Sequence, residues 1–306
     1  MEDLTTLLIT IGEEIQDAEE ECFLLFAQDI PSANLGFVDS RATTVDVTVH
    51  GHDYTIHQSP TLLSSSRAGG TTGAVLWKIT PIFSSWITSS TNPLYKSNIL
   101  TPSSTAVELG CGISGLIALT LSPKISHYIA TDQEYVHRLL RQNLEANATQ
   151  TQHQPSKSKG KKAGKVKSGA QPSSNITFTS LDWELDDPAN LKESIEGGGS
   201  EDKGFDLLIS CDCIYNEALI APFVRACRDV SRLRPVYGPE KGEADEPKPT
   251  VCIIAQQQRS PDVFEAWLME TMRYFRVWRI SDEVLGKELG LGSGYLVHLL
   301  VLRDEE

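Results

Sequence analysis

The segment that most constrains the fold is Thr105–Gly115, which has the sequence TAVELGCGISG. Its first five residues are mostly apolar and predict a short buried strand, and the apolar run Leu116–Leu121 predicts a helix. Between them stand glycines at positions 110, 112 and 115, which let the backbone turn tightly and let a ligand lie against it. A strand, a glycine turn and a helix in this order predict the first half of a βαβ unit.

The spacing of these glycines, G-x-G-x-x-G, is also that of a dinucleotide site. Glu108 favours a different ligand, because it places a carboxylate at the end of the strand, beside the turn. A negative charge there suits a ligand that carries an ammonium group better than one that carries a pyrophosphate. S-adenosylmethionine (SAM) has an ammonium and a sulfonium and no phosphate, so it suits Glu108 better, but the glycine turn alone could serve either SAM or NAD.

Composition narrows the class of protein. The 306 residues carry a net charge of −14 and are 40% hydrophobic, which allows a sizeable core and disfavours general binding of nucleic acid. The six cysteines form no CxxC pair and the seven histidines have no zinc spacing, so we expect reduced thiols in a cytosolic protein and no metal. The sequence shows neither a signal peptide nor an apolar run long enough to span a membrane.

Strand and helix patterns alternate through the rest of the chain and end in two strands. This order predicts a doubly wound, Rossmann-like α/β sheet of seven strands, mostly parallel with an antiparallel C-terminal strand. We expect an N-terminal extension over 1–66, with helices and a β-hairpin, and the main domain over 67–306. The segment 149–174 holds six lysines and no acid, and it predicts a disordered insertion that could also contact ribosomal RNA or act as a nuclear signal.

Candidate functional residues follow several predicted strands, where ligands of open α/β sheets bind. Asp132 ends the second strand, where an acid commonly accepts hydrogen bonds from ribose, although it could instead cap the next helix. Trp183 follows the third strand and could form an aromatic wall for adenine. Trp77 stands beside a glycine-rich loop, and a core aromatic is an equally good interpretation.

Together, the segments Gly70-Thr-Thr-Gly…Trp77, Glu108-Leu-Gly-Cys-Gly, Leu181-Asp-Trp183 and Asp212-Cys-Ile-Tyr215 resemble the SAM-dependent, seven-β-strand protein lysine methyltransferases called family 16. The D-x-x-Y tetrad after the fourth strand is the mark of that family, and the resemblance covers roughly residues 67–306. The opening residues resemble those of the fungal ribosomal lysine methyltransferases, whose substrate class is a 60S ribosomal protein.

The resemblance implies a role for each matching position. The cofactor-binding residues would be Trp77, Glu108, Gly110, Cys111, Gly112, Asp132, Trp183 and Cys211. Asp212 and Tyr215 would border the lysine channel as the catalytic residues, with Asp212 holding the incoming ammonium and Tyr215 forming a wall by cation–π contact. A packing role at the start of a helix is the alternative for Tyr215.

We therefore expect a monomeric, cytoplasmic SAM-dependent protein lysine methyltransferase that acts on a basic ribosomal protein, with no membrane and no specific nucleic-acid partner. Nuclear localisation, and an elongation factor or a chaperone as the acceptor, are alternatives. Two other classes stay open, an NAD-type oxidoreductase and a catalytically silent SAM-binding module. Neither a nucleophilic triad nor paired carboxylates are needed, because a sulfonium leaving group requires no acid.

Overall fold

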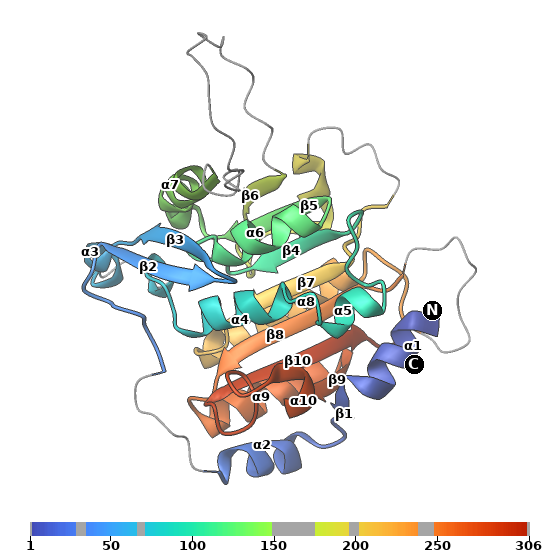
Figure 1. Ribbon diagram of the computed structural model, residues 1–306. Coiled ribbons are helices and arrows are strands. Elements are labelled where there is room, and N and C mark those ends of the chain that lie inside the picture. The colour runs from blue at the N-terminus through green and yellow to red at the C-terminus, as the bar shows by residue number, and fades with distance from the viewer. Residues whose placement is uncertain are drawn as a thin grey trace, which may run out of the picture.

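A twisted eight-stranded sheet forms the centre of the molecule (Figure 1). The computed structural model describes residues 2–28, 35–65, 71–148, 175–195, 202–237 and 248–304. The strand order is β1-β9-β10-β8-β7-β4-β5-β6. These strands are β1 (Gly12–Glu14), β4 (Thr105–Leu109), β5 (His127–Asp132), β6 (Ile176–Ser180), β7 (Leu207–Cys211), β8 (Val251–Gln257), β9 (Phe275–Ile280) and β10 (Tyr295–Leu302).

The sheet confirms the predicted Rossmann-like class. Strands β6, β5, β4, β7 and β8 are parallel, whereas β10 is antiparallel to both β8 and β9. The eighth strand, β1, was not predicted. It has only three residues and pairs antiparallel with β9, through Gly12 opposite Ile280, so it was too short to give an alternating pattern. Its pairing joins the N-terminal segment to the main sheet.

Helices cover both faces of the sheet (Figure 1). The main ones are α1 (Glu2–Thr10), α2 (Ala18–Phe26), α4 (Ile79–Ile87), α6 (Leu116–Leu121), α7 (His137–Ala148), α8 (Ile220–Ser231) and α9 (Pro261–Met272); α3 (Pro60–Leu63), α5 (Pro93–Lys96) and α10 (Asp282–Leu285) are single turns. Leu4, Phe83 and Ile117 pack on one face with Ile253 of β8. Leu25, Phe223 and Trp267 pack on the other with Ile254. Neighbouring residues of a strand thus enter different cores, which explains the continuous apolar runs.

The predicted hairpin forms from β2 (Thr44–Val49) and β3 (His52–His57), and it packs on α7 through two buried asparagines. Asn143 accepts from the His57 amide at 2.8 Å and donates to its carbonyl at 2.8 Å. Asn147 makes the same pair of bonds with Thr55, each 3.0 Å long. The two side-chain amides therefore satisfy backbone N–H and C=O groups along one edge of β3, which would otherwise be unpaired. This contact gives the small hairpin the larger core that it needs.

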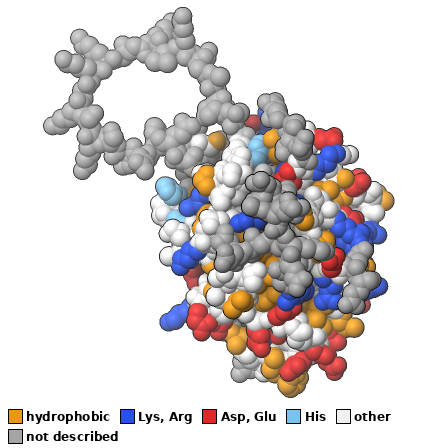
Figure 2. All heavy atoms as spheres, turned by 90° about the vertical axis from the view of Figure 1, so that its right-hand side faces the viewer, with side chains coloured by type: hydrophobic (Ala, Val, Ile, Leu, Met, Phe, Trp, Pro, Cys, Tyr) orange, Lys and Arg blue, Asp and Glu red, His pale blue; other side chains and the backbone are white. Residues whose placement is uncertain are grey.

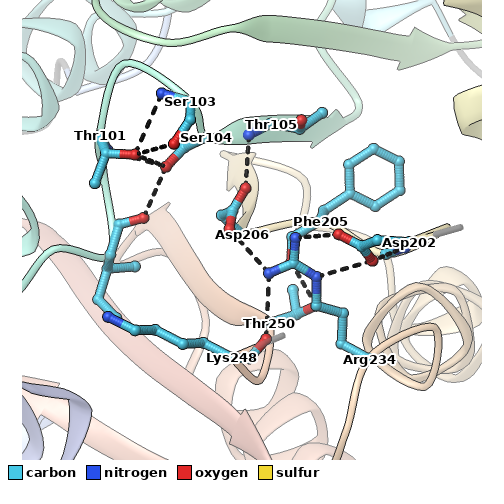
Figure 3. A network of polar contacts seen from close by, with 12 residues as sticks. Thr101, Ser103, Ser104, Thr105, Asp202, Phe205, Asp206, Arg234, Lys248 and Thr250 are labelled. Atoms are coloured by element: carbon cyan, nitrogen blue, oxygen red, sulfur yellow. Dashed lines mark hydrogen bonds and ion pairs between the residues drawn. The ribbon is translucent and has the colours of Figure 1, made fainter. Parts of the chain in front are cut away.

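At the opposite end of the sheet from the glycine turn, Arg234 connects the starts of β4 and β7 (Figure 3). Its guanidinium bonds Asp206 at 2.8 Å and Asp202 at 2.6 Å, with only 6% of its side chain exposed. Asp206 in turn accepts from the amide of Thr105 at 2.7 Å. The network therefore ties the start of β4 to the start of β7.

On the face shown in Figure 2, acidic and basic side chains are interspersed over much of the described surface. Two large apolar side chains of α2 are exposed, Phe23 at 71% and Leu24 at 47%. No helix in the described ranges is long and apolar enough to cross a membrane. The lysine-rich segment 149–174 lies outside the described residues.

Candidate functional site

The glycine turn leaves β4 in a conformation that suits glycine. Gly110 has φ +76° and Gly112 has φ +59°, values that side chains with a Cβ rarely adopt. A Cβ on Gly110 would lie 2.3 Å from the Cys213 sulfur and 3.3 Å from the Trp183 ring. The turn therefore requires glycine for two reasons: its φ angles are positive, and other side chains approach its backbone closely.

The segment before α4 lies across the same turn. The amide of Ile113 donates to the carbonyl of Gly73 at 2.9 Å, and the indole of Trp77 donates to the carbonyl of Thr72 at 3.2 Å. The α4 helix begins only at Ile79. Pro81 thus falls in the first turn, where its missing N–H costs nothing. Trp77 is left outside the helix, half-buried beside the cavity.

A cavity with about 970 Å³ of empty space opens over the carboxyl ends of β4, β5 and β7. All ten predicted site residues line it. Five acidic residues line it, Glu108, Asp132, Asp182, Glu184 and Asp212, whereas its described lining includes no lysine, arginine or histidine. Such a wall attracts a cationic ligand and repels a pyrophosphate. The charge of the cavity therefore favours SAM over NAD.

Glu108 is buried at the end of β4, with 3% of its surface exposed. Its Oε2 accepts from the hydroxyl of Tyr128 at 2.7 Å. Burial raises the pKa of Glu108 to about 7, although the hydrogen bond from Tyr128 opposes this rise. The carboxylate is thus poorly solvated in the free protein, and a bound cation would stabilise its ionised form.

Asp132 connects the end of β5 to the glycine turn. Its Oδ2 accepts from the amide of Gly112 at 2.8 Å, and its Oδ1 accepts from the amide of Gln133 at 2.7 Å. Burial raises its pKa to about 6, and these two amides act in the opposite direction. The alternative role as a helix cap is not seen, because neither bond comes from an amide within the following helical segment, which begins at Glu134.

Trp183 and the thiols of Cys111 and Cys211 complete the wall of the cavity. The Trp183 ring lies 5.1 Å from that of Phe223, in an edge-to-face arrangement. Its Nε1 is buried with no hydrogen-bond partner in the described parts of the chain, so the ring is held by packing. Burial raises the pKa values of Cys111 and Cys211 well above normal, and both thiols therefore remain protonated near neutral pH.

Asp212 follows β7 with φ +66°, an uncommon conformation for a residue other than glycine, which often marks a functional site. Both of its carboxylate oxygens are bonded to Arg259, at 2.7 Å and 2.5 Å. Its Oδ1 also accepts from the amide of Gln257 at 3.0 Å. The carboxylate is therefore neutralised by a cation of the same chain, which the sequence did not suggest.

Tyr215 is 37% exposed at the rim of the cavity. Its hydroxyl accepts a hydrogen bond from Thr72 at 3.0 Å, which connects the D-x-x-Y segment to the segment before α4. Burial of the hydroxyl raises its pKa. Tyr215 lies two residues before the next helical segment, which begins at Glu217.

The structure adds functional candidates that sequence reasoning missed, namely Thr72, Tyr128, Tyr135 and Arg259. Tyr135 lines the cavity, and a Cβ on Gly73 would lie 3.0 Å from its hydroxyl. Arg259 could have been found, because it stands two residues after β8, at the same edge of the sheet as Asp212. Tyr128 gave no such signal, because a tyrosine within a strand is normally read as part of the core.

A glycine turn at a strand's carboxyl end, with an acidic cavity over it, defines a Rossmann-like SAM-dependent methyltransferase. The family model for lysine methyltransferase matches residues 56–159. Ribosomal lysine N-methyltransferase 5 of Zygosaccharomyces rouxii is 32% identical over 252 residues, which cover 77% of this chain and 76% of that protein. The chain therefore belongs to the lysine methyltransferase family, and its cofactor is SAM.

Two further relatives are more distant. Ribosomal lysine N-methyltransferase 5 of Candida glabrata is 27% identical, over 73% of this chain and 71% of that protein. The diaminohydroxyphosphoribosylamino-pyrimidine deaminase of Schizosaccharomyces pombe is 27% identical over 89% of this chain. The match spans 55% of the deaminase, so this chain corresponds to about half of that relative's length.

We expect Gly110→Ala to abolish measurable SAM binding. The new Cβ would meet the Cys213 sulfur, at a position whose φ of +76° already disfavours alanine. Calorimetric titration with SAM checks the result. Gly51→Ala is the control, since Gly51 has φ +77° but open space around its Cβ, at the turn of the β2–β3 hairpin. Normal binding by Gly110→Ala would show that the close approach of this turn is not required.

Proposed function

We propose that this protein transfers a methyl group from SAM to the ε-amine of a lysine in a 60S ribosomal protein. Family membership supports protein-lysine methylation, and the names of two relatives support the ribosomal acceptor. The observation that carries the proposal is the acidic cavity, in which the cofactor-facing carboxylates and the D-x-x-Y residues lie together. A net charge of −14 also favours encounter with a basic protein.

Bound SAM supplies a methyl group activated by a sulfonium. In our proposal, Glu108 faces its ammonium, Asp132 accepts from its ribose and Trp183 lies beside its adenine. Gly110, Cys111 and Gly112 line the methionyl part, while Trp77 and Cys211 close the pocket. Asp212 and Tyr215 stand at the rim and orient the incoming amine. Alignment of the amine with the methyl group can lower the barrier by about 7–11 kcal/mol.

Mass spectrometry of ribosomal proteins tests this function. Purified 60S subunits would be incubated with SAM and the protein, and the acceptor would be recognised by a mass increase of one or more methyl groups on a lysine. Parallel reactions with elongation factors and chaperones test the alternative acceptors. Methylation of one of these, with none on ribosomal proteins, would overturn the proposed substrate. No transfer to any of them would favour a silent SAM-binding module.

A further inference from the structure

The ion pair between Asp212 and Arg259 has a consequence for the charge of the acceptor. The Asp212 side chain is 2% exposed and that of Arg259 is 24% exposed. The guanidinium also lies over the Trp77 ring, 4.8 Å from its centre. Two hydrogen bonds and the Trp77 ring thus hold Arg259 behind the lining of the cavity, in contact with Asp212.

An unpaired carboxylate at this position would bind a lysine as its ammonium, which cannot attack the methyl group. A free lysine has a pKa of about 10.4 and is almost fully protonated near neutral pH. A neighbouring carboxylate would raise that pKa further, whereas a carboxylate already paired with a guanidinium would not. The pair leaves Asp212 able to orient an N–H group while exerting little net charge.

We propose that Arg259 is a positioning residue that cancels the charge of Asp212, so that the channel admits the acceptor lysine as a neutral amine. This inference rests on the proposed lysine methylation and deepens it. The ammonium loses one proton to water before it binds. The amine nitrogen then bonds the methyl carbon, and the carbon–sulfur bond breaks with its electron pair left on sulfur. The resulting methylammonium releases its second proton to water.

Several other titratable groups lie near the pair. Those that interact with Asp212 or Arg259 electrostatically are Cys211, Cys213, Tyr215 and Tyr295, and Glu108 interacts with the two thiols. The pKa values of the thiols and tyrosines are raised, that of Tyr295 to about 12, so these groups stay neutral between about pH 6 and pH 9. Glu108 titrates near pH 7, and Asp132, which interacts with Cys213 and Tyr215, titrates near pH 6, but both are common to all the variants compared below.

The test measures how the binding of n-butylamine, a probe for the lysine side chain, depends on pH. Calorimetry would use protein saturated with S-adenosylhomocysteine. A site that takes the neutral amine releases one proton per ligand, so the apparent affinity should rise about tenfold per pH unit. We expect this slope for the wild-type protein and for Arg259→Lys. Arg259→Gln should bind the ammonium instead, with a slope near zero.

The double variant Arg259→Gln/Asp212→Asn removes both charges and should restore the wild-type slope. A wild-type slope in Arg259→Gln, or a flat slope in the double variant or in the wild-type protein, would overturn the proposal. A second readout is kcat for methylation of 60S proteins, whose pH midpoint should move up by about one unit in Arg259→Gln. If no ribosomal protein is methylated, the proposed substrate fails, while the butylamine slopes still decide the role of Arg259.

Discussion

Replacing Asp212 with alanine is expected to slow methyl transfer by about 100-fold or more while leaving SAM affinity little changed. The rate should fall because the incoming amine loses the oxygen that orients it, and a misplacement of about 1 Å is enough for such a loss. The affinity should persist because Arg259 already neutralises this carboxylate, so the cofactor gains little from its charge. Calorimetry with SAM checks the expected affinity, and initial rates of methylation of ribosomal proteins check the expected loss of rate.

Asp206→Ala is the matched control. Asp206 is also an aspartate paired with an arginine, Arg234, at 2.8 Å, but it lies at the start of β7, at the other end of the sheet (Figure 3). Its loss should lower stability and leave the turnover of the folded fraction unchanged. Full turnover by Asp212→Ala would show that Asp212 has no role in transfer. Equal loss of turnover in both variants would mean that disrupted packing explains the effect.

Glu108→Gln is expected to weaken SAM binding by about 10- to 100-fold, because a hydrogen bond to a charged partner contributes about 1.5–3 kcal/mol. The same change should stabilise the free protein above pH 7. The pKa of Glu108 is raised from 4.5 to about 7, so its contribution to stability is present below pH 4.5 and is lost as the pH rises to about 7. Glutamine does not ionise, so the variant avoids this loss in the free energy of unfolding, which is about 3 kcal/mol.

Urea unfolding without cofactor, at about pH 4 and pH 8, checks the sign of this effect. The variant should gain stability only at the higher pH. For the wild-type protein, SAM affinity should also fall as the pH drops below about 7, since the protonated acid cannot pair with an ammonium. Glu145→Gln, an exposed change on α7, is the control. If Glu108→Gln gained equal stability at both pH values, burial of the charged carboxylate would not be the cause of the gain.

The sheet could be predicted because its strands are apolar on both faces and alternate with helices, and the glycine spacing located the turn. The sequence indicated less well where short elements begin. β1 has three residues, too few for a periodic pattern, and it exists only because β9 offers an edge to pair with. Similarly, α4 begins at Ile79, because Trp77 and the residues before it pack over the glycine turn.

The sequence alone indicated the fold class and ten of the residues that line the cavity. Chain order places the ends of parallel strands at one edge of the sheet, and the resemblance to the lysine methyltransferases supplied Cys211, Asp212 and Tyr215. Only the tertiary structure decided the state of the charged groups. Glu108 is buried and accepts a hydrogen bond from Tyr128 of the next strand, and Asp212 is paired with Arg259, 47 residues later. Charge state is set by distance and solvent access, which no spacing along the chain encodes.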